Sequence, residues 1–203
     1  MKGTSLLLLL QKTVETLKSN GVSFALAGGI VASIYRDQAR FTEDIDLLFV
    51  SDSAEKDATK ILKQLGYEVT LVKLHQLKRL PMMNKKRAPA LIAVGRSTAQ
   101  MYGVDFVLPS MPWVEKALQR AQHNALDFGF GPIPCITVED MILAKAFAGR
   151  RKDDDDLISI FSAEPVFDLI YIAAEMTRLK FSFSKEVLEF APKALKKVLA
   201  KKR

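Results

Sequence analysis

The sequence of 203 residues contains a single cysteine, Cys135, and only two histidines, His75 and His123. One cysteine excludes an internal disulfide framework and fits the reducing cytosol, so we expect a cytoplasmic protein. The apolar run from Leu6 to Leu10 is too short to span a membrane, and its flanks do not suit a signal peptide. The two histidines lack the spacing of metal ligands, and we expect both to be structural.

Internal repeats and low-complexity linkers are also missing, and the composition is that of an ordinary globular protein. Hydrophobic residues make up 49% of the chain and charged residues 26%, which excludes a disordered chain. The net charge of +7 is a modest basic bias. It permits an anionic partner such as a nucleotide or RNA without requiring one.

Hydrophobic periodicity predicts an α+β fold, with a mixed sheet in the first half of the chain and a helical second half. Strands are expected at 22–27, 45–50, 67–74, 90–94 and 102–108. Helices are expected at 5–20, 30–36, 54–65, 141–148, 153–162, 165–180 and 184–201. We therefore expect a sheet-containing core over 1–110 and a mainly helical region over 111–203, with the boundary falling near 110–137.

Three local signals support these helix ends. The pair Asn20-Gly21 is a plausible C-cap for the first helix. The stretch from Ser51 to Ser53 offers an N-cap for the helix at 54–65. The tetrapeptide from Thr137 to Asp140 has the form of a capping box, with aspartate in place of the usual glutamate.

The stretch "FTEDIDLLF" places two acidic residues, Asp44 and Asp46, inside a predicted buried strand. Residues two apart on a strand point to the same face, so these carboxylates can share one or two cations. Asp105 in "YGVDFVLP" is a third lone acid in an apolar strand. Mg²⁺, which prefers carboxylate oxygens together with substrate phosphates, would neutralise such a cluster. Each acid taken singly also fits an exposed strand face or a turn.

Upstream, "FALAGGIVASIY" predicts a strand, the pair Gly28-Gly29 and then a helix. Glycine allows close backbone approach, and a helix N-terminus favours anions, so the arrangement suits a triphosphate. A simple tight turn is the alternative. The dinucleotide fingerprint G-x-G-x-x-G is absent, and so is the Gly-Lys-Ser/Thr of a P-loop. Ser33 lies one turn further on, as a phosphate contact or a small packing residue.

These motifs together resemble the DNA polymerase β-type nucleotidyltransferase superfamily. Its pattern is matched by Gly28-Gly29, then the segment from Thr42 to Asp46, and then Asp105. The sequence "GGIVASIYRDQARFTEDIDLLF" is similar to the AbiEii/AbiGii toxin nucleotidyltransferases of type IV toxin–antitoxin systems. The resemblance continues in "ITVEDMILAKAFAGRRKDDDDLISIF", where a late motif is occupied by Lys145, Arg150, Lys152, Asp153 and Asp156.

The resemblance implies a nucleotidyltransferase-type fold and metal-dependent transfer of NMP from an NTP to a hydroxyl acceptor. It implies Asp44, Asp46 and Asp105 as ligands of Mg²⁺, or alternatively Mn²⁺, and Gly28 and Gly29 as the cradle of the pyrophosphate. Asp105 would also help to deprotonate the acceptor.

In the late motif, Lys145 would contact a phosphate, or be a solvated helix residue. Asp156 would orient Lys145 or act as an auxiliary base. The acidic run from Asp153 to Asp156 equally suits a helix start, where acids favour the macrodipole.

The acceptor expected from the resemblance is RNA, such as a tRNA end, or a protein hydroxyl, and an antitoxin is an expected partner. DNA and membranes are not expected. Six residues that can be cationic lie between 75 and 89, and we expect this loop to dock a polyanion or to be simply solvated. Two alternatives stay open, namely transfer to a small molecule such as an aminoglycoside, and nucleotide or partner binding without catalysis.

Overall fold

The computed structural model describes residues 5–38, 41–73 and 90–200. The basic loop predicted at 75–89 lies outside these residues. Within them, five strands form one mixed sheet, and the predicted α+β class is confirmed. No helix in the described ranges is long and apolar enough to cross a membrane.

The sheet has the strand order β1-β2-β5-β4-β3, and the central pair β2 and β5 is parallel whereas the other pairs are antiparallel. The strands are β1 (Ser23–Leu26), β2 (Asp44–Val50), β3 (Glu68–Lys73), β4 (Ala90–Arg96) and β5 (Gly103–Val107). Each predicted strand is therefore present, with bounds shifted by one or two residues. The sequence could not show that β5 inserts between β2 and β4, because that order joins segments far apart in the chain.

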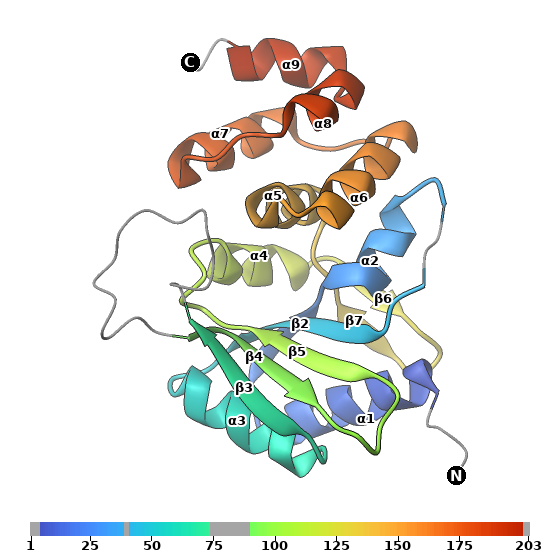
Figure 1. Ribbon diagram of the computed structural model, residues 1–203, viewed down its shortest axis with the longest axis vertical. Helices are drawn as coiled ribbons and strands as arrows, with labels where there is room; N and C mark the ends of the chain where they lie inside the picture. Colours follow the sequence, from blue (N-terminus) through green and yellow to red (C-terminus); the bar gives the residue numbers. More distant parts are fainter. Residues whose placement is uncertain (1–4, 39–40, 74–89, 201–203) are drawn as a thin grey trace.

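One face of the sheet carries the main apolar core and is covered by α1 (Leu6–Ser19) and α3 (Ala54–Gln64), which lie below the sheet in Figure 1. Alternate residues of β2 point into this core, and all of them are fully buried: Ile45, Leu47 and Phe49. The rings of Phe49 and Phe106 stack with centroids 5.0 Å apart. The intervening aspartates of β2 consequently point to the opposite face.

That opposite face is covered by α2 (Gly28–Tyr35) and α4 (Val114–Ala121). The helix expected at 30–36 begins two residues earlier, so the glycine pair forms the first turn of α2. The helix at 54–65 begins after Ser53 as predicted, but the Ser53 side chain makes no capping bond.

A small hairpin of β6 (Ala125–Asp127) and β7 (Pro132–Pro134) follows α4, in a part of the chain that we expected to be helical. Prolines at both ends of a three-residue strand hide its sequence signal. The chain after β7 runs beside β1, where the Ile136 N–H donates to the Leu26 carbonyl at 3.0 Å. The hairpin therefore ties the second half of the chain to the edge of the sheet.

Five further helices stack above α2 and α4, so that α1 and α9 lie at opposite ends of the molecule (Figure 1). They are α5 (Val138–Ala148), α6 (Arg151–Ser162), α7 (Leu169–Leu179), α8 (Lys185–Phe190) and α9 (Lys193–Ala200). The single helix expected at 184–201 is wrong, because Ala191 is extended before Pro192, which has no N–H to continue a helix.

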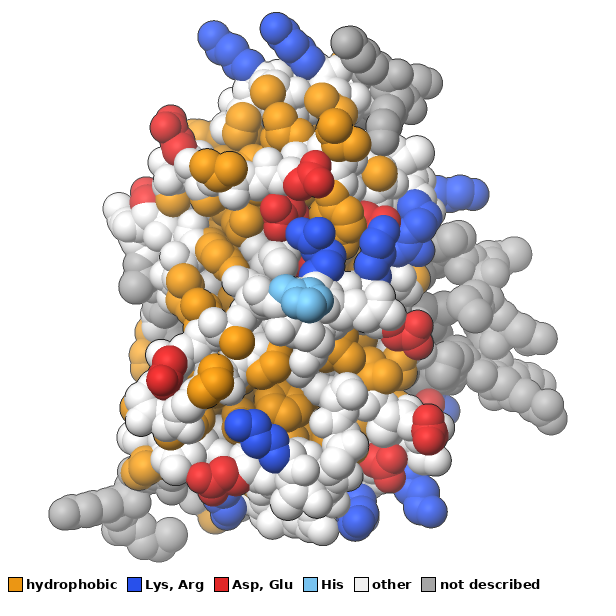
Figure 2. Space-filling model, turned by 180° about the vertical axis from the view of Figure 1, so that it is seen from behind, with side chains coloured by type: hydrophobic (Ala, Val, Ile, Leu, Met, Phe, Trp, Pro, Cys, Tyr) orange, Lys and Arg blue, Asp and Glu red, His pale blue; other side chains and the backbone are white. Residues whose placement is uncertain are grey.

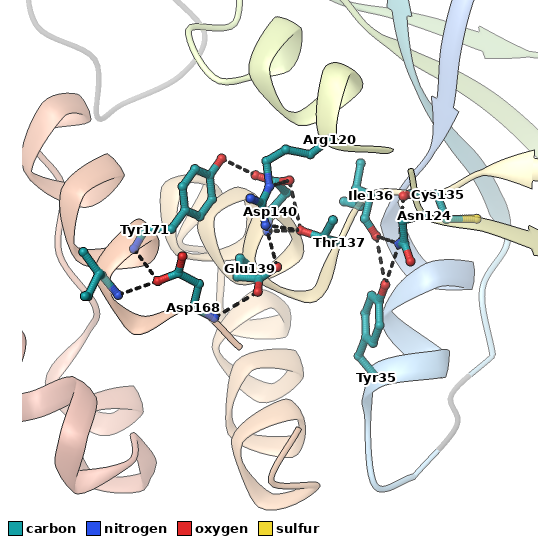
Figure 3. Close-up of polar contacts among 11 residues, drawn as sticks. Tyr35, Arg120, Asn124, Cys135, Ile136, Thr137, Glu139, Asp140, Asp168 and Tyr171 are labelled. Carbon is teal, nitrogen blue, oxygen red and sulfur yellow. Dashed lines mark hydrogen bonds and ion pairs between the residues drawn. The ribbon is translucent and has the colours of Figure 1, made fainter. Parts of the chain in front are cut away.

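A polar network joins α4, α5 and α7 (Figure 3). The Thr137 side chain caps α5 by accepting from the Asp140 N–H, which is one of the two bonds of the predicted capping box. Arg120 of α4 donates to Asp140 at 3.0 Å and to Glu139 at 2.8 Å. The Tyr171 hydroxyl of α7 donates to the other Asp140 oxygen at 2.7 Å. These contacts hold α5, which carries Lys145, against the layer below.

Candidate active site

The three predicted acidic residues lie on the same face of the sheet. Asp44 and Asp46 are two residues apart on β2, and Asp46 is paired in register with Asp105 on the parallel neighbour β5. Residues paired in this way point to the same side of a sheet. The face that they share is the one covered by α2, opposite the main apolar core.

Gly28 brings the first turn of α2 into direct contact with Asp46. Its φ is +63°, and a Cβ atom at this position would overlap the Asp46 carboxylate. The backbone N–H of Gly29 donates to the same carboxylate. An L-residue with a side chain would therefore be excluded from position 28 both by backbone strain and by lack of space.

Arg96, at the end of β4, neutralises two of the three carboxylates. Its guanidinium contacts both oxygens of Asp105, at 2.5 and 3.1 Å, and one oxygen of Asp44 at 3.2 Å. The Arg96 side chain is 50% exposed, against 36% for Asp44 and 14% for Asp105. The acidic cluster is thus open to solvent on the Arg96 side.

The electrostatics of the cluster disfavour full ionisation of the acids. Burial raises the pKa of the Asp46 carboxyl group, and the Asp44 charge raises it further, although Lys145 acts in the opposite direction. Burial also raises the pKa of Asp105, against the lowering effect of its hydrogen bond with Arg96. Two partly buried carboxylates beside each other are stabilised by positive charge, which a bound cation would supply.

Lys145, from α5, is buried and held by two aspartates of α6. Its ammonium lies 2.7 Å from Asp156 and 3.2 Å from Asp153, and both carboxylates are fully buried. Lys145 is thus not a solvated helix residue, and Asp156 contacts it directly. Whether either acts in chemistry stays a prediction.

The acidic run at the start of α6 has two faces. Asp153 and Asp156 point inward, whereas Asp154 and Asp155 are partly or fully exposed. Asp153 also accepts from the backbone N–H of Arg150, which caps the helix, and from its guanidinium at 2.6 Å. Asp153 therefore lies at a helix start, as the acidic run suggested, and also forms ion pairs with Lys145 and Arg150.

Arg36, which follows α2, forms an ion pair with the buried Asp156. Asp156 therefore connects α2, α5 and α6, because it contacts Arg36 and Lys145 from different elements. Within α2, the Ser33 hydroxyl donates to the Gly29 carbonyl at 3.0 Å. This bond lies within the helix and directs the Ser33 proton to the backbone.

The sequence analysis did not assign a role to Arg96 or Arg36. Arg96 can be placed near the aspartates only once the strand register is known. Gly95 of β4 pairs with Val104 of β5, and the antiparallel register then puts Arg96 opposite Gly103. Arg36 reaches Asp156 across 120 positions of the chain, for which no local pattern exists.

The residues present fit a divalent cation in the kind of donor that they offer. Asp44, Asp46 and Asp105 supply only carboxylate oxygens, which Mg²⁺ and Mn²⁺ prefer. In the arrangement seen across residues 5–38, 41–73 and 90–200, no three acidic, histidine or cysteine side chains are placed to hold a metal. The Arg96 guanidinium lies between two of the three acids.

The family model described as "Nucleotidyl transferase AbiEii toxin, Type IV TA system" matches residues 15–173. No curated protein sequence matches this chain.

Two solved structures are similar to this chain in fold. An antigenic nucleotidyltransferase-like protein from Paracoccidioides brasiliensis has 18% identity and a TM-score of 0.49, with 98% of this chain and 90% of that chain covered. The antibiotic-resistance factor ANT(2'')-Ia has 15% identity and a TM-score of 0.42, with 97% of this chain and 85% of that chain covered.

Proposed function

This chain belongs to the AbiEii nucleotidyltransferase toxin family, and from that premise we propose that it transfers NMP from an NTP to a hydroxyl group of RNA or protein. In this reaction the acceptor oxygen forms a bond to the α-phosphorus, the bond from that phosphorus to the bridging oxygen breaks, and pyrophosphate leaves. The observation that carries the proposal is the placement of Asp44, Asp46 and Asp105 on one sheet face beside the N-terminus of α2.

The three aspartates would hold Mg²⁺, or alternatively Mn²⁺. Divalent cations bound by carboxylates stabilise the negative charge that develops on phosphoryl oxygens during an in-line displacement. Asp105 would also accept the proton of the acceptor hydroxyl.

The other residues of the site would bind and orient the triphosphate. The first turn of α2, with Gly28 and Gly29, would offer backbone N–H groups to the triphosphate, where the Gly29 N–H now donates to Asp46. Lys145 would add a positive charge, and Asp153 and Asp156 keep its ammonium in a fixed place. Asp156 is in this proposal a positioning residue, because it acts through Lys145 and Arg36. The phosphate contact predicted for Ser33 stays a prediction, and Ser33 donates to the Gly29 carbonyl within α2.

For the acceptor we propose RNA, such as tRNA, with a protein hydroxyl as the other candidate. The net charge of +7 supports an anionic acceptor. On the face shown in Figure 2, Lys and Arg side chains lie among Asp and Glu side chains, so this face presents mixed charge. NTPs and RNA are cytoplasmic, as is the reducing environment that a single cysteine fits, and we place the reaction there.

The proposal is tested by incubating the purified protein with each of the four NTPs labelled at the α-phosphate, together with Mg²⁺ and either total RNA or cell-lysate protein. We expect label in RNA or protein and release of pyrophosphate. Asp44→Asn should abolish transfer while the protein stays folded, because the change removes a carboxylate without burying a new charge.

Asp52→Asn is the matched control, since it makes the same change on an exposed turn directly after β2. It should transfer label at the wild-type rate. Label transfer that survives Asp44→Asn would contradict the assignment of the site. Label found only on added aminoglycosides would replace the macromolecular acceptor by a small molecule.

In the type IV system that the family description names, the partner of such a toxin is an antitoxin. We extend the toxin role to this chain and expect its expression to arrest growth through the same aspartates. Growth arrest by wild type but not by Asp44→Asn would support that extension.

A further inference from the structure

We propose that Arg96 is the resident counter-cation of Asp44 and Asp105, and that a divalent metal binds by displacing its guanidinium. Arg96 would thereby set the metal affinity of the site. The inference rests on the proposed function, because it takes the three aspartates as metal ligands.

The first argument is that Arg96 uses the oxygen atoms that a metal would need. Both oxygens of Asp105 and the Oδ1 atom of Asp44 lie within 2.5 to 3.2 Å of its two terminal nitrogens. A paired guanidinium and a metal ion cannot share these oxygens at bonding distance. Metal binding at this pair therefore requires the arginine to leave.

The second argument is that the sheet contains a space for this arginine. Asp44 pairs with Gly103 on β5, and the register of β4 continues to place Arg96 on the other side of Gly103. A Cβ atom on Gly103 would lie 2.5 Å from a terminal nitrogen of Arg96 and 2.5 Å from Oδ1 of Asp44. Only glycine between them lets the two side chains meet across the central strand.

The φ of Gly103 lies outside the left-handed region, so backbone freedom does not explain a glycine there. Glycine is needed at position 103 because the absence of a Cβ atom leaves room for the contact between Arg96 and Asp44. Arg96, Gly103 and Asp44 are cross-strand neighbours on β4, β5 and β2. On the same sheet face, the pair of Asp46 and Asp105 lies two residues further along β2 and β5.

The third argument is that Arg96 can leave at modest cost. Its side chain is 50% exposed, so a displaced guanidinium enters water and is not trapped in the core. A divalent cation brings twice the charge and can also neutralise Asp46, which the guanidinium is not seen to contact. Because the arginine competes for the same oxygens, removing it should tighten metal binding, by about tenfold for a bidentate charge-assisted pair of this exposure.

The test is a titration of the full chain with Mn²⁺, followed by electron paramagnetic resonance of the free ion. We expect Arg96→Gln to lower the Kd about tenfold relative to wild type. Arg96→Lys, which keeps the charge but loses the two-pronged contact, should give an intermediate Kd. Thermal unfolding without metal should occur at a lower temperature in Arg96→Gln, and added Mn²⁺ should raise its Tm by more than it raises that of wild type.

Arg178→Gln is the matched control. Arg178 is 47% exposed and contacts the Glu175 carboxylate through two nitrogens, at 2.9 and 2.7 Å, on a different helix layer. The Arg178→Gln variant loses the same charge and a comparable ion pair. Its Tm should therefore fall, and its Kd for Mn²⁺ should equal that of wild type.

Two results would overturn the inference, and they are distinguishable. If Mn²⁺ binds to wild type, is lost in Asp44→Asn and has an equal or higher Kd in Arg96→Gln, then Arg96 does not compete, and the proposed function stands. If wild type and both Arg96 variants all fail to bind Mn²⁺ while remaining folded, the metal site of the proposed function fails together with the inference.

Discussion

At the scale of single residues, the candidate site depends on where a side chain is missing. Gly28 and Gly103 each lie against an aspartate of β2, and a Cβ atom at either position would meet a carboxylate. The two cases differ, because Gly28 also has a positive φ of +63°. The acidic cluster is thus shaped by glycines as much as by the acids.

Replacing Gly28 by alanine should destabilise the protein by at least about 2 kcal/mol, because left-handed strain adds to the overlap with Asp46. Gly21→Ala is the control. Gly21 has a similar φ of +66°, but a Cβ atom there would have nothing within 4 Å, so only strain of about 1 kcal/mol applies. Free energies of unfolding from urea titrations measure both. Equal losses in the two variants would show that Asp46 does not restrict position 28.

At the scale of elements, the position of Lys145 depends on how α5 starts. Thr137 caps the helix, and its hydroxyl also donates to the Asp140 carboxylate at 3.0 Å. The Arg120 guanidinium in turn donates to the Thr137 hydroxyl at 3.2 Å. Two turns later the same helix carries Lys145 into its contacts with Asp153 and Asp156. The start of α5 therefore links the helical layer to the site.

Thr137→Ala should cost about 1 to 2 kcal/mol of stability, because it removes an N-cap and leaves polar partners of the hydroxyl unsatisfied. Ser53→Ala makes a similar change at the N-cap of α3, where the side chain forms no capping bond. It should change the free energy of unfolding by no more than about 0.5 kcal/mol. The pair of urea titrations separates a used cap from an unused one. If Ser53→Ala lost as much free energy of unfolding as Thr137→Ala, the capping bond would not explain the loss of stability in Thr137→Ala.

At the scale of the whole molecule, ion pairs between helices make folding depend on pH. Burial raises the pKa of Glu175, but hydrogen bonds from Arg178 and Lys116 outweigh it, and the pKa is lowered below 4.5. Burial also raises the pKa of Glu139, but hydrogen bonds, among them one from the backbone N–H of Asp168, outweigh it, and the pKa of Glu139 is lowered as well. A carboxyl group with a lower pKa in the folded state stabilises the fold above its unfolded pKa.

This stabilisation should be present at neutral pH and be lost as the pH falls below about 4.5 through the folded pKa values. Glu175→Gln should therefore be less stable than wild type at pH 7, and the difference should shrink towards pH 3. Glu189→Gln, a change of an exposed glutamate on α8, is the control and should show a nearly constant difference. Urea midpoints between pH 3 and pH 7 measure this. A difference for Glu175→Gln that grows towards low pH would contradict the expected sign.

Individual elements show which features of the fold can be predicted from the sequence. The strand alternation around Asp44 and Asp46, the glycine pair at the start of α2 and the N-cap at Thr137 are local patterns, and the structure has each of them. The single helix expected at 184–201 was wrong, although Pro192 is a local signal that could have shown the break between α8 and α9. The hairpin of β6 and β7 could not be predicted in this way, because three-residue strands carry too little periodicity.

By itself the sequence determined which faces of the helices and strands are apolar, that Asp44 and Asp46 share a face, and which family the motifs resemble. These properties follow from side-chain periodicity over a few residues, and that periodicity is independent of the rest of the fold. The tertiary structure alone decided that β5 lies beside β2, that Arg96 reaches two aspartates across Gly103, and that Asp156 binds Arg36 and Lys145. Such contacts join distant parts of the chain, and strand order and register, which the packing of the whole core selects, bring them together.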